Sequence, residues 1–254
     1  MKPLFEVNGL SKSFGGVVVA DDISLSLSAG DRVAMIGPNG AGKTTFVNMV
    51  SGLIKACSGT IALDGQDITR AKRAERVSRG LVRTFQVTRL FHGMSLLEHV
   101  LLAILHREKK TRKTMLSISK ATALQEEARA RLDSLKLLGE ADLPVGEIPY
   151  GQQRLLEIAI ALSLNPTVLF LDEPAAGVPL GEIPLIEQAI DRLPPEIAVL
   201  MIEHDMDFVF RFAKRVIVLA AGKIICDGSP AEVATAPLVR EAYLGSYVQR
   251  GADA

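Results

Sequence analysis

The amino-acid sequence predicts an α/β fold whose sheet is covered on both faces. Three apolar runs without alternation indicate strands buried on both sides; they are VLFLDEP (168–174), AVLMIEHD (198–205) and RVIVLAAGKII (215–225). Strand and helix patterns also alternate before residue 87, whereas 87–148 is helical in character. This order is typical of an α/β core with an inserted helical subdomain.

The first 86 residues predict several strands and one helix. We assign the earliest strands to an antiparallel β subdomain. Apolar and polar residues alternate in VVVADDISLSL (17–27), as in a half-buried strand. Other strand-like segments are LFEVNGL (4–10), RVAMIG (32–37), GTIALDGQDI (59–68) and LVRTFQ (81–86). A helix is expected after the glycine-rich turn that follows residue 37. Its apolar face is formed by Phe46, Val47 and Val50.

The segment 87–148 predicts helices, and one of them is clearly amphipathic. Its apolar residues recur at i, i+4, i+8 and i+11, which places them on one face; they are Leu124, Ala128, Leu132 and Leu135. No internal repeat or low-complexity segment interrupts the chain.

Composition excludes several classes of protein. The 254 residues carry 29 Lys+Arg and 29 Asp+Glu, so no net charge favours nucleic acid or acidic lipid. Cys57 and Cys226 lie far apart without metal or redox spacing, which suits a reducing compartment. No run approaches the ~18 apolar residues of a membrane span, and Glu6 interrupts the start too soon for a signal peptide. We expect a cytosolic protein, or one held at a membrane by its partners.

The segment GPNGAGKTT, Gly37–Thr45, predicts a phosphate-binding loop because it follows a strand and precedes a helix. Gly40 and Gly42 let backbone N–H groups approach phosphate oxygens without a Cβ in the way. Lys43 brings an ammonium to the β- and γ-phosphates, and the Thr44 hydroxyl is placed to bind Mg²⁺. The predicted ATP contacts in this loop are Gly37, Asn39, Gly40, Gly42, Lys43, Thr44 and Thr45.

Two later strands end in residues that suit phosphate chemistry. Asp172 ends an apolar strand and is the natural Mg²⁺ ligand, and Glu173 can polarise a water for attack on the γ-phosphate. Carboxylates that merely cap the next helix are the alternative when this motif is taken alone. His204 follows the next strand, which would place it beside the γ-phosphate in a parallel sheet.

Five motifs in this order, GPNGAGKTT, TFQ, YGQQ, LDEP and IEHD, resemble the ATP-binding subunit of an ABC transporter. The resemblance covers essentially the whole chain. It implies that Phe14 stacks on adenine, that Gln86 contacts Mg²⁺ and senses a membrane partner, and that His204 is the switch histidine. It also implies a single ABC ATPase domain, 1–254. Residues 1–86 and 149–254 would form its nucleotide-binding core, and 87–148 its helical subdomain.

The family's signature sequence is altered here. It usually reads Leu-Ser-Gly-Gly-Gln, and Ile148-Pro149-Tyr150-Gly151-Gln152 aligns with it. In the family this motif binds the γ-phosphate of ATP held by the opposite subunit. Pro149 removes the serine hydroxyl, a loss of about 1.5–3 kcal/mol for one charge-assisted hydrogen bond, and Tyr150 replaces a glycine. We interpret the motif as modified but functional, with a non-binding version as the alternative.

The YGQQ signature, the EPAAG sequence and the ending GKIICDGSPAEVATAPLVREAYLG resemble the branched-chain amino acid uptake subgroup. Pro179 departs from it, because the subgroup has Asn there and most ABC proteins have Asp. Proline lacks an N–H group and has a fixed φ, so contacts across the subunit pair must differ. This departure favours a second ATPase that is a different chain, although a pair of identical chains stays open.

The resemblance implies an ATPase that energises uptake of branched-chain amino acids or related small solutes. Two ATP-binding subunits would close around ATP and Mg²⁺ and drive two transmembrane permease subunits, with a solute-binding protein involved indirectly and no nucleic acid. The protein would lie peripherally on the cytoplasmic face of the inner membrane. Two alternatives are a soluble ABC-type ATPase acting on nucleic acid or ribosomes, and a regulatory subunit that binds ATP but hydrolyses it poorly.

Overall fold

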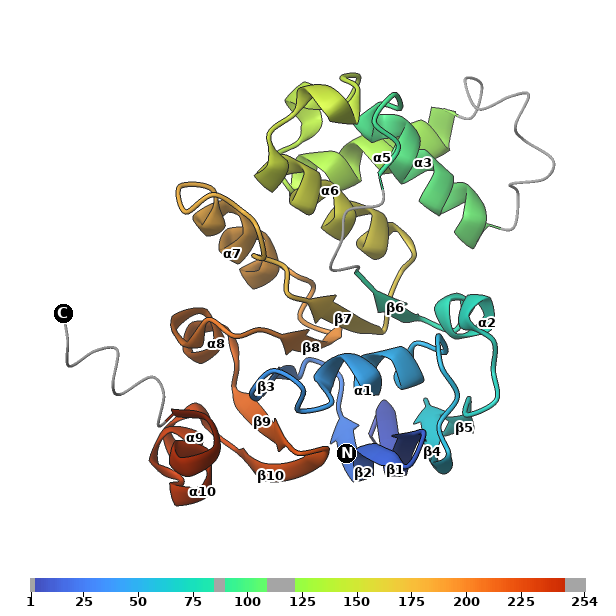
Figure 1. Cartoon of the computed structure of the whole chain (residues 1–254). Coiled ribbons are helices and arrows are strands. Elements are labelled where there is room, and N and C mark those ends of the chain that lie inside the picture. The colour runs from blue at the N-terminus through green and yellow to red at the C-terminus, as the bar shows by residue number, and fades with distance from the viewer. Residues whose placement is uncertain (1–2, 85–89, 109–121, 245–254) are drawn as a thin grey trace.

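The computed structural model describes residues 3–84, 90–108 and 122–244 (Figure 1). Gln86 and most of the basic stretch 106–120 lie outside these residues. Within the described part of the chain, no helix is both long enough and apolar enough to cross a bilayer.

The larger sheet carries the chemistry-bearing motifs at its strand ends. Among the described residues it has six strands in the order β10-β9-β3-β8-β7-β6. Neighbouring strands from β9 to β6 run parallel, and β10 is antiparallel to β9. The strands are β3 (Arg32–Ile36), β6 (Leu81–Arg83), β7 (Val168–Asp172), β8 (Ala198–Ile202), β9 (Arg215–Ala220) and β10 (Lys223–Gly228). The buried strands predicted within 168–174 and 198–205 are confirmed. The predicted run 215–225 is wrong as a single buried strand, because a turn at Ala221 and Gly222 divides it between β9 and the partly exposed β10. β6 is shorter than the segment 81–86.

The smaller sheet is antiparallel, as predicted. Its order is β2-β1-β4-β5 among the described residues. The side chains of Ile23, Leu25 and Leu27 are buried on one face of β2, which confirms the predicted alternation. The strands are β1 (Phe5–Phe14), β2 (Val17–Leu27), β4 (Ser58–Leu63) and β5 (Gln66–Asp67).

Helices cover both faces of the larger sheet. The helices of the described residues are α1 (Lys43–Val50), α2 (Arg73–Ser78), α3 (Leu96–Arg107), α5 (Thr122–Ser134), α6 (Tyr150–Ser163), α7 (Ile183–Asp191), α8 (Met206–Phe212), α9 (Pro230–Thr235) and α10 (Pro237–Val239). Short helical turns occur at Leu138–Glu140, Val145–Glu147 and Arg240–Leu244. In Figure 1, α1 lies between the two sheets, whereas α3, α5 and α6 form a group beyond the β6 end of the larger sheet. Ala128 and Leu132 of α5 are buried, which confirms the amphipathic helix predicted there.

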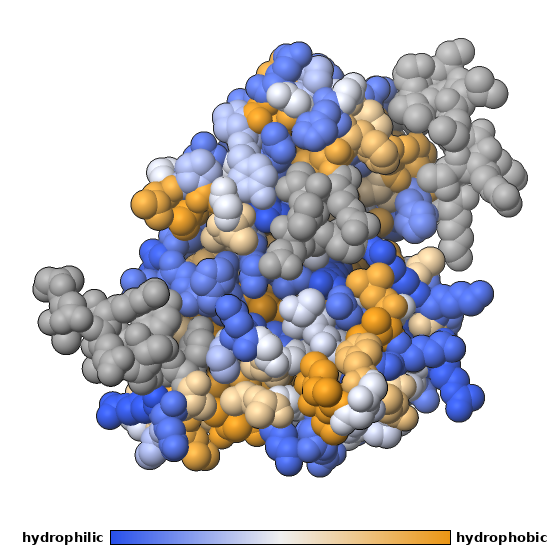
Figure 2. Space-filling model, viewed as in Figure 1, coloured by the Kyte–Doolittle hydropathy of each residue, from blue (hydrophilic) through white to orange (hydrophobic). Residues whose placement is uncertain are grey.

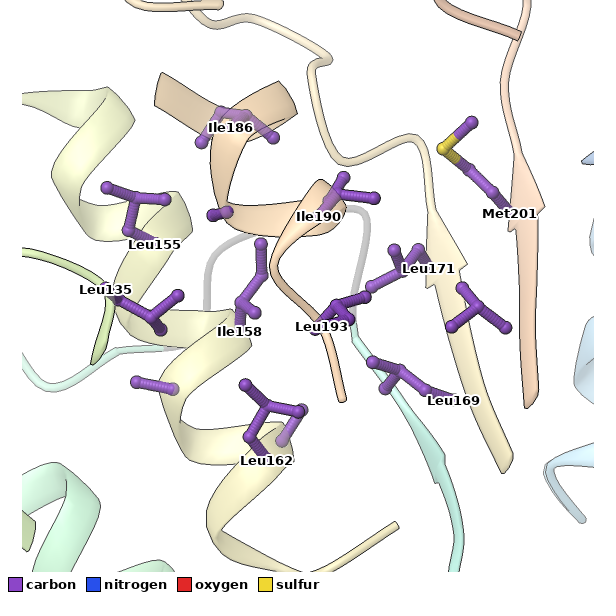
Figure 3. Packing of buried hydrophobic residues seen from close by; sticks show 14 of the residues in the cluster. Leu135, Leu155, Ile158, Leu162, Leu169, Leu171, Ile186, Ile190, Leu193 and Met201 are labelled. Carbon is purple, nitrogen blue, oxygen red and sulfur yellow. The ribbon is translucent and has the colours of Figure 1, made fainter. Parts of the chain in front are cut away.

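Successive residues of the parallel strands point into two different hydrophobic clusters. Leu169 and Leu171 of β7 join the cluster that includes α6, α7 and α8. Figure 3 shows them beside Ile190 of α7 and Leu193, with the α6 residues on the other side of these two, namely Leu155, Ile158 and Leu162. The intervening residues Val168 and Phe170 join the cluster that contains α1 and the smaller sheet. The sheet is therefore buried on both faces, as its continuous apolar strands require.

A buried arginine caps the C-terminal end of α1, the helix that follows the glycine-rich loop. The guanidinium of Arg76 donates hydrogen bonds to the carbonyls of Met49 and Val50 at 2.9 and 2.7 Å, and to those of Ala71 and Thr69 at 3.0 and 2.8 Å. The last carbonyls of a helix have no partner within the helix, and a cation near them is favourable. Arg76 thus fixes the C-terminal end of α1, although burial lowers its pKa.

Replacing Arg76 with Met should destabilise the protein by about 2–4 kcal/mol, because buried carbonyls would lose charge-assisted donors. Denaturant unfolding followed by circular dichroism measures the effect. Arg79→Met is the matched control, since Arg79 pairs with Glu75 at the surface and such pairs contribute about 0–1 kcal/mol. Equal unfolding midpoints for the two variants would contradict the role assigned to Arg76.

Candidate nucleotide site

Three adjacent parallel strands bring the predicted motifs to one edge of the larger sheet. Met35 of β3 pairs with Ile202 of β8, which pairs on its other side with Asp172 of β7. The glycine-rich loop, the carboxylates and His204 all follow this row within a few residues. Ligands of open α/β sheets bind at the carboxyl ends of the strands.

Two glycines of the loop have no room for a side chain. Gly37 has φ +151°, and a Cβ there would lie 2.0 Å from the carbonyl oxygen of Leu219. Gly42, at φ +105°, would bring a Cβ to 2.5 Å from the carbonyl oxygen of Val19. The loop therefore packs directly against the backbone of β9 and β2, which fixes its path between β3 and α1.

Lys43 reaches back over the glycine-rich loop. Its ammonium donates to the carbonyls of Gly37 at 2.5 Å and Pro38 at 3.1 Å. Burial lowers the pKa of Lys43, while the nearby carboxylates of Glu173 and Asp172 act in the opposite direction. The ammonium thus lies inside the loop and close to the two acids. Of the remaining predicted contacts, Asn39, Gly40 and Thr44 are exposed, and Thr45 is half-buried.

Asp172 is buried and already has a cationic partner. Arg83, from the end of β6, donates to Asp172 Oδ2 at 2.6 Å and to the side-chain oxygen of Asn48 in α1 at 2.7 Å. The N–H group of Asp172 donates to Thr84 Oγ1 at 3.3 Å. Sequence reasoning missed Arg83, because only the fold brings the end of β6 beside the end of β7.

Glu173 lies at an unusual backbone position. Its φ is +48°, and its N–H group donates to the carbonyl of Ile202 at 2.9 Å. A residue other than glycine in this region costs on the order of 1 kcal/mol, and such residues cluster at functional sites. The bond to Ile202 holds the turn after β7 against the end of β8, so the carboxyl group of Glu173 starts from a fixed point.

His204 lies on the surface beside a buried carboxyl group. Its side chain is 64% exposed, and its Nδ1 is 3.5 Å from Oε2 of Glu203. Burial raises the pKa of Glu203, although the N–H groups of His204, Asp205 and Ala175 oppose this shift. Sequence reasoning singled out His204 within IEHD but missed Glu203, since nothing in that motif shows that the glutamate points inward.

The altered signature begins α6 and is bound to a loop of the same chain. The N–H group of Gly151 donates to Glu182 Oε2 at 2.7 Å. Tyr150 packs beside Gly177, where a Cβ would lie 3.5 Å from the tyrosine ring. Arg154 lies 5.3 Å from the centre of that ring and donates to the carbonyl of Ala176 at 3.2 Å. Tyr150 therefore connects the signature to the loop after β7. The sequence showed only that Tyr150 replaces a glycine of the signature, and it did not indicate this contact.

The other two signature residues differ in exposure. Pro149 is exposed and immediately precedes α6. Gln152 is half-buried, and its Oε1 atom has no hydrogen-bond partner among the described residues. Neither residue contributes a hydroxyl group at the position where the family has serine.

Phe14 lies at the tip of the β1–β2 hairpin. It is 49% exposed, and the ammonium of Lys12 is 5.0 Å from the centre of its ring. Val17 and Val18, which follow on β2, are also exposed, and the next residue, Val19, borders Gly42 of the glycine-rich loop. Figure 2 shows hydrophobic side chains gathered on the lower part of the molecule, over the region of the smaller sheet. An exposed aromatic ring on this hairpin is available to stack on a flat ligand.

Comparison with known proteins decides the family. The family model described as ABC transporter matches residues 20–176. The chain belongs to the ABC transporter family. As an ABC ATPase, it binds nucleotide and couples ATP hydrolysis to transport.

Relatives of this ABC protein match over nearly their whole length. The high-affinity branched-chain amino acid transport ATP-binding protein BraF of Pseudomonas aeruginosa is 37% identical over 253 residues, covering 96% of this chain and 98% of its own. The corresponding protein LivG of Escherichia coli K12 is 37% identical over 252 residues, with the same coverage. A probable LivG of Methanocaldococcus jannaschii is 33% identical over 250 residues, covering 95% and 97%.

Solved structures share the fold. A nucleotide-free ATP-binding cassette from an ABC transporter superposes with a TM-score of 0.84 at 32% identity, covering 95% of this chain and 98% of its own. A cassette in its ADP conformation gives a TM-score of 0.84 at 33% identity, covering 96% and 100%. The predicted P-loop NTPase core is therefore confirmed.

Replacing Gly42 with Ala should weaken ATP binding by about 10- to 100-fold, because strain of roughly 1–3 kcal/mol would displace the loop. Titration with a fluorescent ATP analogue measures the dissociation constant. Gly93→Ala is the control, since a Cβ at Gly93 meets nothing within 4 Å. Unchanged binding by a folded Gly42→Ala protein would contradict the assignment of this loop to phosphate.

Proposed function

We propose that this ABC ATPase energises the uptake of branched-chain amino acids or related small solutes. The full-length similarity to BraF and LivG supports the solute class. The meeting of the glycine-rich loop, Asp172, Glu173 and His204 at one sheet edge is the observation that carries the chemistry. In this proposal the whole chain acts as one ATPase unit, peripheral to the cytoplasmic face of the inner membrane, with 87–148 as its helical subdomain.

Lys43 and the backbone of Gly37–Thr45 hold the phosphates in the proposed site. Glu173 accepts a proton from the attacking water, and His204 contacts the γ-phosphate. Phe14 stacks on the adenine. Because the ammonium of Lys43 bonds two loop carbonyls, phosphate oxygens replace these acceptors when ATP binds.

The site has donors that suit Mg²⁺, which prefers oxygen ligands and keeps several waters. The Thr44 hydroxyl and the Asp172 carboxylate are such donors, and we assign Gln86 to the same ion. The described residues hold no group of three or more His, Cys, Asp or Glu side chains that could bind a metal ion. Thr44, Asp172 and Gln86 would hold the ion, which when bound would neutralise charge on the phosphates.

A second ATP-binding subunit completes the site in this proposal. Pro149, Tyr150, Gly151 and Gln152 face the ATP of that subunit, where the Gly151 N–H group and the α6 N-terminus attract the γ-phosphate. Glu182 occupies this N–H group in the structure. Leu180 is 86% exposed beside Pro179, which suits a contact with another chain. We favour a different chain as the partner because Pro179 replaces the residue that the subgroup uses across the pair.

A groove beside β6 suits a helix of a permease subunit. Its volume is about 230 Å³, and it lies between the end of α1, α2, β6 and α6. Apolar side chains dominate its lining, with Leu53 46% exposed; they include Leu53, Val77, Leu81, Val82, Leu90, Ile160 and Leu164. Arg83, the partner of Asp172, also lines it, so a docked helix would touch a residue bound to the hydrolytic site. Two permease subunits would bind two such grooves, and a solute-binding protein would act from the other side of the membrane.

Glu173→Gln should lower ATP hydrolysis by about 100-fold or more while ATP binding stays within about twofold, because the amide cannot accept the proton of the water. Phosphate release and nucleotide titration measure the two properties. Glu187→Gln, on the side of α7 that pairs with Arg211 of α8, is the control. If hydrolysis were unaffected, Glu173 would not be the base. If the wild-type protein bound ATP without hydrolysing it in the complex, a regulatory subunit would be the better description.

Leu53→Glu should release the protein from its permease partners, because a docked helix would bury the carboxylate among apolar side chains at a desolvation cost. The fraction that sediments with membranes should fall several-fold while ATP affinity is unchanged. Leu238→Glu is the matched control, since Leu238 is 60% exposed on α10 and away from the groove. Equal membrane association of both variants would contradict the docking site.

Removing the carboxylate of Glu182 should strengthen ATP-driven pairing, because the γ-phosphate would no longer compete for the Gly151 N–H group. Glu182→Ala in a Glu173→Gln background should lower the dissociation constant of the pair by about tenfold, the effect of one such hydrogen bond. Size-exclusion chromatography with light scattering, using the ATPase partner that co-purifies, measures pairing. The exposed Glu196→Gln serves as the control. Weaker or unchanged pairing would mean that Glu182 does not compete with phosphate.

A further inference from the structure

Glu203 is a buried charged group to which the proposed mechanism gives no role. It directly follows β8 and is 2% exposed. Its Oε2 accepts hydrogen bonds from the N–H groups of His204 at 2.8 Å and Asp205 at 3.4 Å, and its Oε1 accepts one from Ala175 at 3.4 Å. Burying a carboxylate is costly unless it is paired and hydrogen-bonded. The Glu203 carboxylate accepts its hydrogen bonds from the two loops that carry Glu173 and His204.

The imidazole of His204 lies against the same carboxylate. Nδ1 is 3.5 Å from Oε2 of Glu203, a separation that a small ring movement would shorten to a hydrogen bond. Functional hydrogen bonds are often long before a ligand binds and shorten in the complex. An ionised carboxylate only accepts, so this contact requires a proton on Nδ1. A phosphate oxygen likewise only accepts, so Nε2 binds the γ-phosphate when it carries a second proton, which makes the ring an imidazolium in that complex.

Glu203 also joins the loops mechanically. Ala175 lies two residues after Glu173, so the bond from its N–H group fixes the turn after β7 to the residue that precedes His204. The bond from the N–H group of Glu173 to Ile202 runs between the same two turns. The carboxylate therefore contacts both the ring of His204 and the backbone that carries Glu173.

We propose that Glu203 is a positioning residue for ATP hydrolysis, holding Nδ1–H of His204 so that Nε2, once protonated, donates to the γ-phosphate. The inference rests on the proposed function, because it takes His204 as the contact to that phosphate. Glu203 does not touch the substrate itself. It acts in the way that a carboxylate orients a functional histidine elsewhere, by fixing the ring and the nitrogen that carries the proton.

Nitrogen-15 NMR of the histidine-labelled protein tests the geometry without any turnover. The chain has 4 histidines, and the signal that disappears in His204→Ala identifies the ring. The neutral ring of His204 should carry its proton on Nδ1 in the wild-type protein and shift toward Nε2–H in Glu203→Gln. A neutral wild-type ring protonated on Nε2 would overturn the proposal, whether or not Glu203→Gln folds.

Steady-state kinetics of the transporter complex purified from membranes tests the role. Glu203→Gln should lower kcat by roughly tenfold with KM for ATP unchanged, the usual size of effect for a group that orients a functional histidine. The same substitution should have no further effect in a His204→Ala background. Glu187→Gln, which removes a half-buried carboxylate paired with Arg211, should leave kcat unchanged.

Two results separate the possible failures. An equal tenfold loss in the His204→Ala background would overturn the inference, since Glu203 would then act independently of the histidine. Normal hydrolysis by His204→Ala would instead overturn the role of His204 in the proposed function. The NMR measurement of the ring does not depend on that role, so the two failures can be told apart.

Discussion

The hydrogen-bonded row Met35–Ile202–Asp172 is the constraint on which the site depends. It sets the register of β3, β8 and β7, so the glycine-rich loop, Glu173 and His204 leave the sheet at one level. Parallel strands need cover on both faces. The cluster around α1 supplies it on one side, and the cluster around α6, α7 and α8 supplies it on the other. Because these strands are buried on both faces, a one-residue shift of register would exchange the residues that face the two clusters and disturb the packing of both, so the core fixes the relative positions of the three motifs.

Three groups that would meet the nucleotide or its metal ion already have partners in this chain. Lys43 bonds loop carbonyls, Asp172 bonds Arg83, and the Gly151 N–H group bonds Glu182. Unpaired polar or charged groups in a partly buried site are costly, so these internal partners stabilise the nucleotide-free protein. Binding must exchange them for phosphate, metal and a second subunit. The affinity for ATP is consequently a difference between two sets of contacts, and mutation of an internal partner can strengthen binding.

The sequence was sufficient for the features that rest on local pattern. Unbroken apolar runs predicted the buried strands, alternation predicted the face of β2, and the spacing of glycines with Lys43 predicted the loop. The pattern could not show contacts between distant side chains. Arg83 reaches Asp172 across 89 positions, and Glu182 reaches Gly151 across 31. Tyr150 was interpreted as the replacement of a glycine, whereas its packing against Gly177 depends on where the loop after β7 runs. Gln86 lies outside the described residues, and its role stays a prediction.

The central claim is that ATP hydrolysis at this sheet edge drives solute uptake. The most direct test is uptake of radiolabelled leucine into proteoliposomes that contain the complex purified from membranes, with ATP enclosed and the solute-binding protein outside. The account predicts uptake that requires enclosed ATP and stops when the complex carries Glu173→Gln. Equal uptake without ATP, or with the Glu173→Gln complex, would contradict it.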